Sequence, residues 1–188
     1  MSEEKIIQRV PLWLAVAITV LISLPFGVYL GVYNLALWAS FIAWAEYFAF
    51  GAKPDALKPI FVNFPLGALF MAIFVIFNTY FIGVLGWDPF LSTAVWIFIW
   101  VAIAVYIMQF FPILTKYSLA YFNGVSMYLA IYFGLYLSGA KLGCGQGPVV
   151  GNPYLDAWIM WVWTSLAGIF GGILGWLNVA LTFPKKVE

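Results

Sequence analysis

Six apolar runs, separated by short segments that hold charged residues, glycine or proline, dominate the pattern of the chain. Apolar runs of about 20 residues predict α-helices that cross a bilayer. One run is shorter, which is consistent with a tilted or thin span that a tight turn joins to its neighbour. The pattern predicts an all-α fold, a polytopic membrane helix bundle of about six transmembrane helices. We expect residues 1–188 to form a single integral membrane domain with spans at about residues 11–33, 35–50, 60–85, 90–114, 117–138 and 154–183.

Composition agrees with a membrane protein and narrows its chemistry. The chain is 65% hydrophobic and 8% charged, whereas soluble proteins average about 25% charged residues. A net charge of +1 gives no reason to expect a nucleic-acid partner. Histidine is absent and Cys144 is the single cysteine, so histidine-ligated haem, copper or iron and thiolate iron–sulfur clusters are excluded. We therefore expect no cofactor and no metal, and no catalytic dyad or nucleophile constellation indicates an enzyme.

The basic residues predict the orientation in the membrane. With six spans, seven of them fall on one flank and only Lys141 on the other, and cytoplasmic loops are the ones enriched in lysine and arginine. The first apolar run is longer than the core of a signal peptide, and no clear cleavage site follows it, so we expect a retained span. The prediction is a multi-pass protein of the inner, cytoplasmic membrane with both termini cytoplasmic and the Cys144 loop outside. The seven residues are Lys5, Arg9, Lys53, Lys58, Lys116, Lys185 and Lys186.

Glu46 is the acidic residue placed deepest inside an apolar segment. At 100° per residue, it shares one helix face with small residues, while Trp38, Phe41, Trp44 and Phe48 fall roughly opposite. Small residues allow a second backbone to approach closely, and ionisable groups at membrane depth usually serve a function. We therefore expect Glu46 to point into protein or a water-filled gap. The alternatives are a purely structural pair, with Lys53, Lys58 or Lys116 as the partner, and a position near the membrane interface. The residues on its face are Ala36, Ala39, Ser40 and Ala43.

A turn-type dipeptide interrupts the fifth apolar run. Asn123-Gly124 follows Phe122 near the start of that run. Such a break is compatible with a re-entrant or unwound segment, which membrane proteins tolerate where it is buried or lines a cavity. A plain helix that contains one glycine is the other interpretation.

Amide side chains and glycines supply the remaining candidates. Amides can replace the hydration shell of a neutral polar solute, and pairs of small residues four positions apart promote close helix packing. With about six spans, the protein would need to form a homo-oligomer or join partner membrane subunits. The candidates for solute or proton binding are Glu46, Asn63, Asn78, Gln109, Asn123 and Asn178. The candidates for helix packing are Gly27, Gly31, Gly168, Gly171, Gly172 and Gly175.

Several stretches resemble two known families. The segment with Trp38, Ala39, Phe41, Tyr47, Phe48 and Ala49, together with the segment 121–124 and the glycine-rich last run, resembles the YcdZ-like small inner-membrane proteins, a family of unknown function. This resemblance implies a membrane fold and no particular activity. Residues 111–115, Phe-Pro-Ile-Leu-Thr, are similar to the Leu-Pro-x-x-Thr start of the urea-channel repeat. That similarity implies a pore for a small solute.

Three functions fit these features. The first is a channel or transporter for a small, largely uncharged solute that passes aromatic walls and amides. The second is a proton-coupled transporter with Glu46 as the proton carrier, since a carboxyl group in a medium of low dielectric can exchange protons near neutral pH. The third is an accessory subunit of a larger membrane complex, whose aromatic surfaces would contact other proteins.

Overall fold

The computed structural model of the protein describes residues 8–138 and 147–182. Lys141 and Cys144 lie outside the described residues, as do Lys5, Lys185 and Lys186. The described part holds seven α-helices, two short 3₁₀-helices and no strand, so the prediction of an all-α fold is confirmed. The α-helices are α1 (Leu12–Val28), α2 (Leu37–Ala49), α3 (Leu57–Gly83), α4 (Pro89–Met108), α5 (Pro112–Lys116), α6 (Ser118–Ser138) and α7 (Pro153–Thr182). The 3₁₀-helices are η1 (Gly31–Tyr33) and η2 (Pro54–Ala56).

The long helices coincide with the apolar runs of the sequence, with two differences. The run at residues 11–33 divides into α1 and η1, since α1 ends at Val28. The run at residues 90–114 divides into α4 and the short α5, because Pro112 has no N–H to continue the backbone ladder of α4. By length and composition, three helical segments of the described chain are able to cross a membrane: Pro54–Gly83, Pro89–Met108 and Pro153–Thr182. The apolar helix α1 is shorter, at 17 residues.

Helix α6 runs without a break through Asn123 and Gly124. The re-entrant interpretation of this dipeptide is therefore wrong, and the plain helix is confirmed. Gly124 has a packing role instead, since a Cβ atom at this position would overlap the carbonyl oxygen of Phe64 on α3. On the facing helix, a Cβ atom at Gly67 would overlap the carbonyl oxygen of Tyr121. The two glycines thus let the backbones of α3 and α6 approach each other directly.

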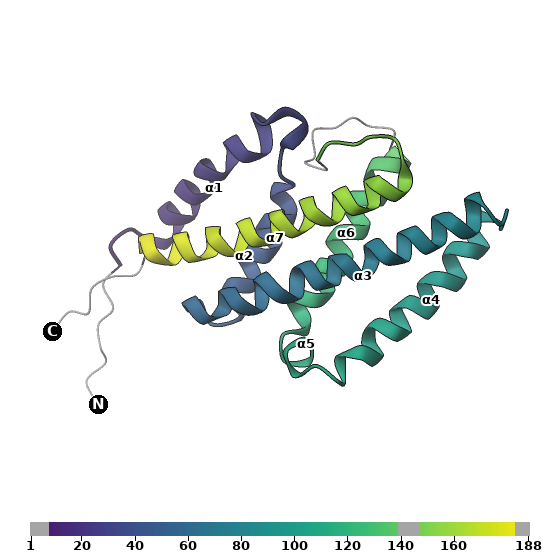
Figure 1. Ribbon diagram of the computed structural model, residues 1–188. Helices are drawn as coiled ribbons and strands as arrows, with labels where there is room; N and C mark the ends of the chain where they lie inside the picture. Colours follow the sequence, from purple (N-terminus) through teal and green to yellow (C-terminus); the bar gives the residue numbers. More distant parts are fainter. Residues whose placement is uncertain (1–7, 139–146, 183–188) are drawn as a thin grey trace.

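Helices α3 and α7 form the centre of the bundle (Figure 1). They run antiparallel and contact each other along much of their length, with Phe64 of α3 lying against Gly168 of α7. Helix α6 packs against α3, and α2 packs against α7. The two outer helices are α1, which packs on α7, and α4, which packs on α3. The most apolar windows of α3 and α7 are each 50% buried and that of α4 only 11%, so α4 is peripheral.

The glycines of α7 face its neighbours. A Cβ atom at Gly171 would overlap the carbonyl oxygen of Ser40 on α2, and one at Gly175 would lie 2.7 Å from the Cβ of Tyr47. Gly172 faces α3, where a Cβ atom would lie 2.9 Å from the ring of Phe61. These three glycines therefore make their contacts within one copy of the chain.

The first glycine pair predicted from the sequence behaves differently. Gly27 packs against Leu37, whereas a Cβ atom at Gly31 would have no neighbouring atom within 4 Å, and the φ of Gly31 is +60°. The prediction of a packing role is wrong for Gly31. Because φ values in this region are costly for other residues, Gly31 is instead the residue that permits the turn at η1.

Candidate functional site

Glu46 is buried between helices and lies one turn before the C-terminal end of α2. Its side chain is 1% exposed, and the small residues that share its face are buried as predicted. The residues of the opposite face differ in exposure. Trp38 and Phe48 are exposed, whereas Trp44 is 7% exposed and belongs to the protein interior. The buried face follows from the contact with α7, where glycines let the small residues of α2 approach closely.

Asn123 of α6 is the hydrogen-bond partner of Glu46. Its Nδ2 donates to Oε1 of Glu46 at 2.6 Å, across 77 positions of the sequence. Asn123 is half-buried, and within the described residues Oε2 of Glu46 accepts no hydrogen bond. A buried carboxyl oxygen without a partner is costly, so Oε2 is an unused acceptor, as are the buried Oδ1 atoms of Asn63 and Asn178 in the described chain.

The expected cationic partners of Glu46 do not reach it. No ion pair joins Glu46 to Lys53, Lys58 or Lys116, all of which belong to the described chain, and Lys53 and Lys58 are exposed. The Nζ of Lys116 lies instead 5.1 Å from the centre of the Tyr117 ring. That ring packs on Phe50, whose ring centre is 5.1 Å away. The structural alternative of a Glu46–lysine pair therefore receives no support.

Asn63 and Gln109 lie apart from this contact. Asn63 donates from Nδ2 to the carbonyl oxygens of Ile113 at 2.9 Å and Tyr117 at 3.2 Å, so it holds the end of α5 against α3. Gln109 is exposed just beyond the end of α4. Neither side chain contacts Glu46 or Asn123.

Asn78 and Asn178 connect the outer helices to the central pair. The Oδ1 of Asn78 accepts a hydrogen bond from Ser92 at 2.7 Å, and its Nδ2 donates to Thr93 at 3.0 Å, which joins α3 to α4. Asn178 donates to Oγ1 of Thr19 at 3.5 Å and joins α7 to α1. Of the six candidates for solute or proton binding, the structure thus brings only Glu46 and Asn123 into contact.

A second buried carboxylate was missed in the sequence. Asp156 is 0% exposed and lies in the first turn of α7. It accepts hydrogen bonds from the backbone N–H of Val150 at 2.8 Å and of Gly151 at 3.1 Å. The signal in the sequence was its position in the first turn of a helix that begins at Pro153. Carboxylates at such positions hold the preceding loop and complement the helix dipole. Because backbone donors already occupy both oxygens, Asp156 serves the structure of this helix start.

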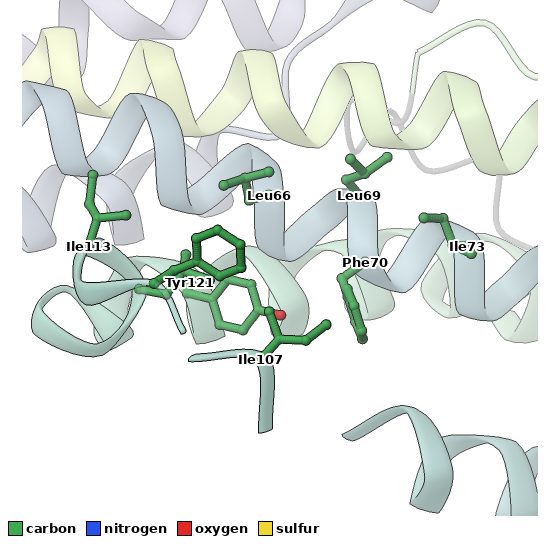
Figure 2. Close-up of a pocket in the computed structure, with 9 residues that line it drawn as sticks. Leu66, Leu69, Phe70, Ile73, Ile107, Ile113 and Tyr121 are labelled. Carbon is green, nitrogen blue, oxygen red and sulfur yellow. The ribbon is translucent and has the colours of Figure 1, made fainter. Parts of the chain in front are cut away.

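The cavities described between the helices are apolar. One of about 260 Å³ lies between α3 and the segment from α4 to α6, where Phe70, Ile73, Ile107 and Tyr121 are among its lining residues (Figure 2). A smaller cavity of about 220 Å³ is lined by Val16 of α1 and three residues of α2. Glu46 lines neither of them.

Comparison with known proteins places the chain in a family without an assigned activity. No curated protein and no solved structure matches it. Residues 14–182, which include every helix from α2 to α7 and most of α1, match the model of one family. The chain therefore belongs to the family described as "Protein of unknown function (DUF1097)".

Proposed function

We propose that this membrane protein carries a small, largely uncharged solute across the bilayer, as a channel or transporter, and that Glu46 and Asn123 contact the solute. The observation that carries the proposal is the buried Oε2 of Glu46, which has no hydrogen-bond partner in the described chain although Oε1 is held by Asn123. A fold that only needed to pack its helices would gain nothing from a half-satisfied carboxyl group.

The chemistry of the pair favours a neutral polar solute. The carboxyl group offers acceptor oxygens, and the amide of Asn123 retains a second N–H and a carbonyl oxygen. Together they match a molecule that carries both donors and acceptors. No lysine or arginine of the described chain neutralises Glu46, so the pair gives an anionic solute no favourable charge.

Proton-coupled transport is the second candidate, and the same oxygen favours it. A carboxyl group held by one amide and by no cation can bind and release a proton without breaking an ion pair. In that case transport of the solute would depend on a pH gradient across the membrane. An accessory role in a larger complex is the third candidate, which co-purification of partner chains would favour.

The membrane and the assembly are part of the proposal. We propose the cytoplasmic membrane, with both termini on the cytoplasmic side, and a homo-oligomer or a complex with partner membrane subunits. The specific YcdZ-like resemblance stays a prediction, since the family match carries no such name. We also propose that the protein is a carrier of solutes and no enzyme.

The test is solute flux into proteoliposomes. We expect purified protein to accelerate stopped-flow swelling in gradients of urea, acetamide or glycerol, relative to empty liposomes. Glu46→Gln keeps an acceptor for Asn123 and should retain most of the flux, whereas Glu46→Ala should lose it. Asp55→Asn is the matched control, because Asp55 is an exposed carboxylate that follows α2 in the chain. Swelling equal to that of empty liposomes for all three solutes would refute the proposal.

The same preparation separates the two transport mechanisms. If Glu46 carries a proton, an imposed pH gradient should change the wild-type flux and leave the Glu46→Gln flux unchanged. Equal responses of both proteins to the gradient would exclude Glu46 as the proton carrier.

A further inference from the structure

The two outer helices are attached to the central pair by equivalent polar contacts. Thr19 of α1 contacts Asn178 of α7 at 3.5 Å, and Thr93 of α4 contacts Asn78 of α3 at 3.0 Å. Thr93 lies 74 positions after Thr19, and Asn78 lies 100 positions before Asn178. The same two residue types therefore make the same contact twice, at fixed separations along the chain.

An aromatic contact repeats with the same separations. Phe26 of α1 and Phe170 of α7 have ring centres 4.8 Å apart, and Trp100 of α4 and Phe70 of α3 have ring centres 5.4 Å apart. Trp100 again lies 74 positions after Phe26, and Phe70 again lies 100 positions before Phe170. Two independent contacts thus give the same correspondence between positions. Helix α1 matches α4 at a separation of 74 positions, and α3 matches α7 at a separation of 100 positions.

The sequence of the central helices agrees with this register. At a separation of 100 positions, the same residue recurs at five places of α3 and α7. These pairs are Val62 and Val162, Leu66 and Leu166, Phe70 and Phe170, Ile73 and Ile173, and Asn78 and Asn178.

The remaining two helices are equivalent as well. Helix α2 packs on α7 as α6 packs on α3. Residues 45–48 of α2 read Ala-Glu-Tyr-Phe, and residues 130–133 of α6 read Ala-Ile-Tyr-Phe, 85 positions later. Tyr47 and Tyr132 are both buried, and each contacts the ring of the phenylalanine that follows it. Helices α1, α2 and α3 and helices α4, α6 and α7 are therefore two copies of one unit of three helices.

We infer that these copies are related by an inverted two-fold symmetry and that each copy can adopt the packing of the other. Through this exchange, access to the Glu46–Asn123 contact alternates between the two ends of the bundle. An odd number of long helices per copy reverses the direction of the second copy, as the antiparallel pair α3 and α7 shows (Figure 1). Membrane transporters with such repeats place the solute at the interface of the copies and alternate access around it. The alternation rests on the proposed transport function, whereas the repeat does not.

The Glu46–Asn123 contact breaks the symmetry. It joins α2 to α6, the equivalent helices of the two copies, and so lies at their interface. At the separation of 85 positions, Glu46 corresponds to Ile131 and Asn123 corresponds to Trp38. The contacts of Asn78 and Asn178 are equivalent in the two copies because they hold the fold. The Glu46–Asn123 pair occurs once, since the equivalent positions hold Ile131 and Trp38. Its role is therefore separate from the packing that the copies share.

The two copies also differ in how closely their first two long helices pack against each other. In the first copy, Leu37 of α2 lies against Gly27 of α1, and the N–H of Leu35 donates to the carbonyl oxygen of Phe26 at 2.8 Å. The corresponding residues of the second copy, Val101 and Phe122, are 41% and 38% exposed. The apolar cavity of about 260 Å³ lies beside α6 in the second copy, with Tyr121 among its lining residues, although neither Val101 nor Phe122 lines it (Figure 2). Exchange of packing would bring Val101 and Phe122 together.

Cysteine cross-linking tests the exchange. In a Cys144→Ser background, Val101→Cys with Phe122→Cys should form a disulfide in proteoliposomes under mild oxidation, detected as protection from a maleimide–polyethylene glycol mass shift. Both positions are exposed, so their substitution leaves the core intact. The control pair is Phe98→Cys with Phe122→Cys, because Phe98 is 76% exposed on the same helix and is not brought to α6 by the symmetry.

The outcomes distinguish this inference from the proposed function. Cross-linking of the Val101 pair, with the Phe98 pair remaining reduced, supports the exchange, and in that case oxidation should also stop solute flux. A Val101 pair that remains reduced, or a Phe98 pair that oxidises equally fast, overturns it, even if wild-type protein conducts solutes. If the Val101 pair cross-links and no flux is found for urea, acetamide or glycerol, the proposed function fails and the exchange of the copies stands.

Discussion

The structure changes the interpretation of Glu46, because it shows which side chain is its partner. From the sequence, Glu46 had three possible partners among the lysines that follow α2 and precede α6. The structure gives it an amide from another helix, and leaves its second oxygen without a hydrogen bond in the described chain. The pair therefore couples the two copies of the repeat through one short hydrogen bond.

The stability of this pair is testable at the level of single side chains. Asn123→Ala removes the hydrogen bond to Oε1 of Glu46, and a buried polar group that loses its partner costs about 1–3 kcal/mol. We expect the apparent melting temperature in detergent to fall by several degrees, measured by size-exclusion chromatography after heating. Glu46→Gln retains an acceptor and should melt close to wild type.

Ser126→Ala is the control for this measurement, because Ser126 lies on the same helix and is exposed. Melting of Asn123→Ala at the wild-type temperature would mean that the hydrogen bond adds nothing to stability.

At the scale of elements, glycines decide which helices meet. Gly171 lets α7 approach the backbone of Ser40 on α2, and Gly67 with Gly124 does the same for α3 and α6. The sequence marked the α7 glycines through their spacing of four. It did not mark Gly67, which stands alone in an apolar run, and at Gly124 it left open a break or a plain helix without indicating a contact.

Substitution of Gly171 tests the α2–α7 contact. Gly171→Ala places a Cβ atom on the carbonyl oxygen of Ser40, which the backbone of α2 can relieve only by moving away. Overpacking of this kind costs about 1–3 kcal/mol, so the melting temperature in detergent should fall. Gly83→Ala is the matched control, since no atom lies within 4 Å of a Cβ at that position. Equal melting of both variants would contradict the close approach.

Gly172 provides a graded comparison on the same helix. A Cβ there meets the ring of Phe61, a side chain that can rotate, so Gly172→Ala should destabilise less than Gly171→Ala. Gly172→Leu requires α3 and α7 to separate and should lower the melting temperature clearly. If Gly172→Leu leaves both the melting temperature and the elution volume unchanged, the conclusion that Gly172 faces α3 is wrong.

At the scale of the whole molecule, the orientation in the membrane is a prediction that rests on the distribution of charge along the chain. The distribution of lysine and arginine predicts that Cys144, which lies outside the described residues, faces the exterior of the cell. Cys144 should react with a membrane-impermeant maleimide on intact cells. In a Cys144→Ser background, Asp55→Cys, on the opposite flank, should react only after the membrane is permeabilised. Labelling in the reverse order would show that the orientation is wrong.

The apolar pattern was enough to place the long helices, because a backbone in a bilayer must satisfy its hydrogen bonds within each segment and apolar length then fixes the element. The small-residue face of α2 was also readable, since helical periodicity is a local property. The burial of Trp44 was not readable, because its neighbours come from elsewhere in the chain.

Tertiary structure alone decided the rest. Asn123 reaches Glu46 across 77 positions, and nothing local to either residue indicates that α6 crosses α2 at this height. The repeat was equally hidden in the sequence, because its helices match at three different separations, and most equivalent positions keep only an apolar character that lipid and protein contacts both accept. The contacts of Thr19 with Asn178 and of Thr93 with Asn78 reveal it, since a polar side chain inside an apolar bundle must find its partner at a defined place.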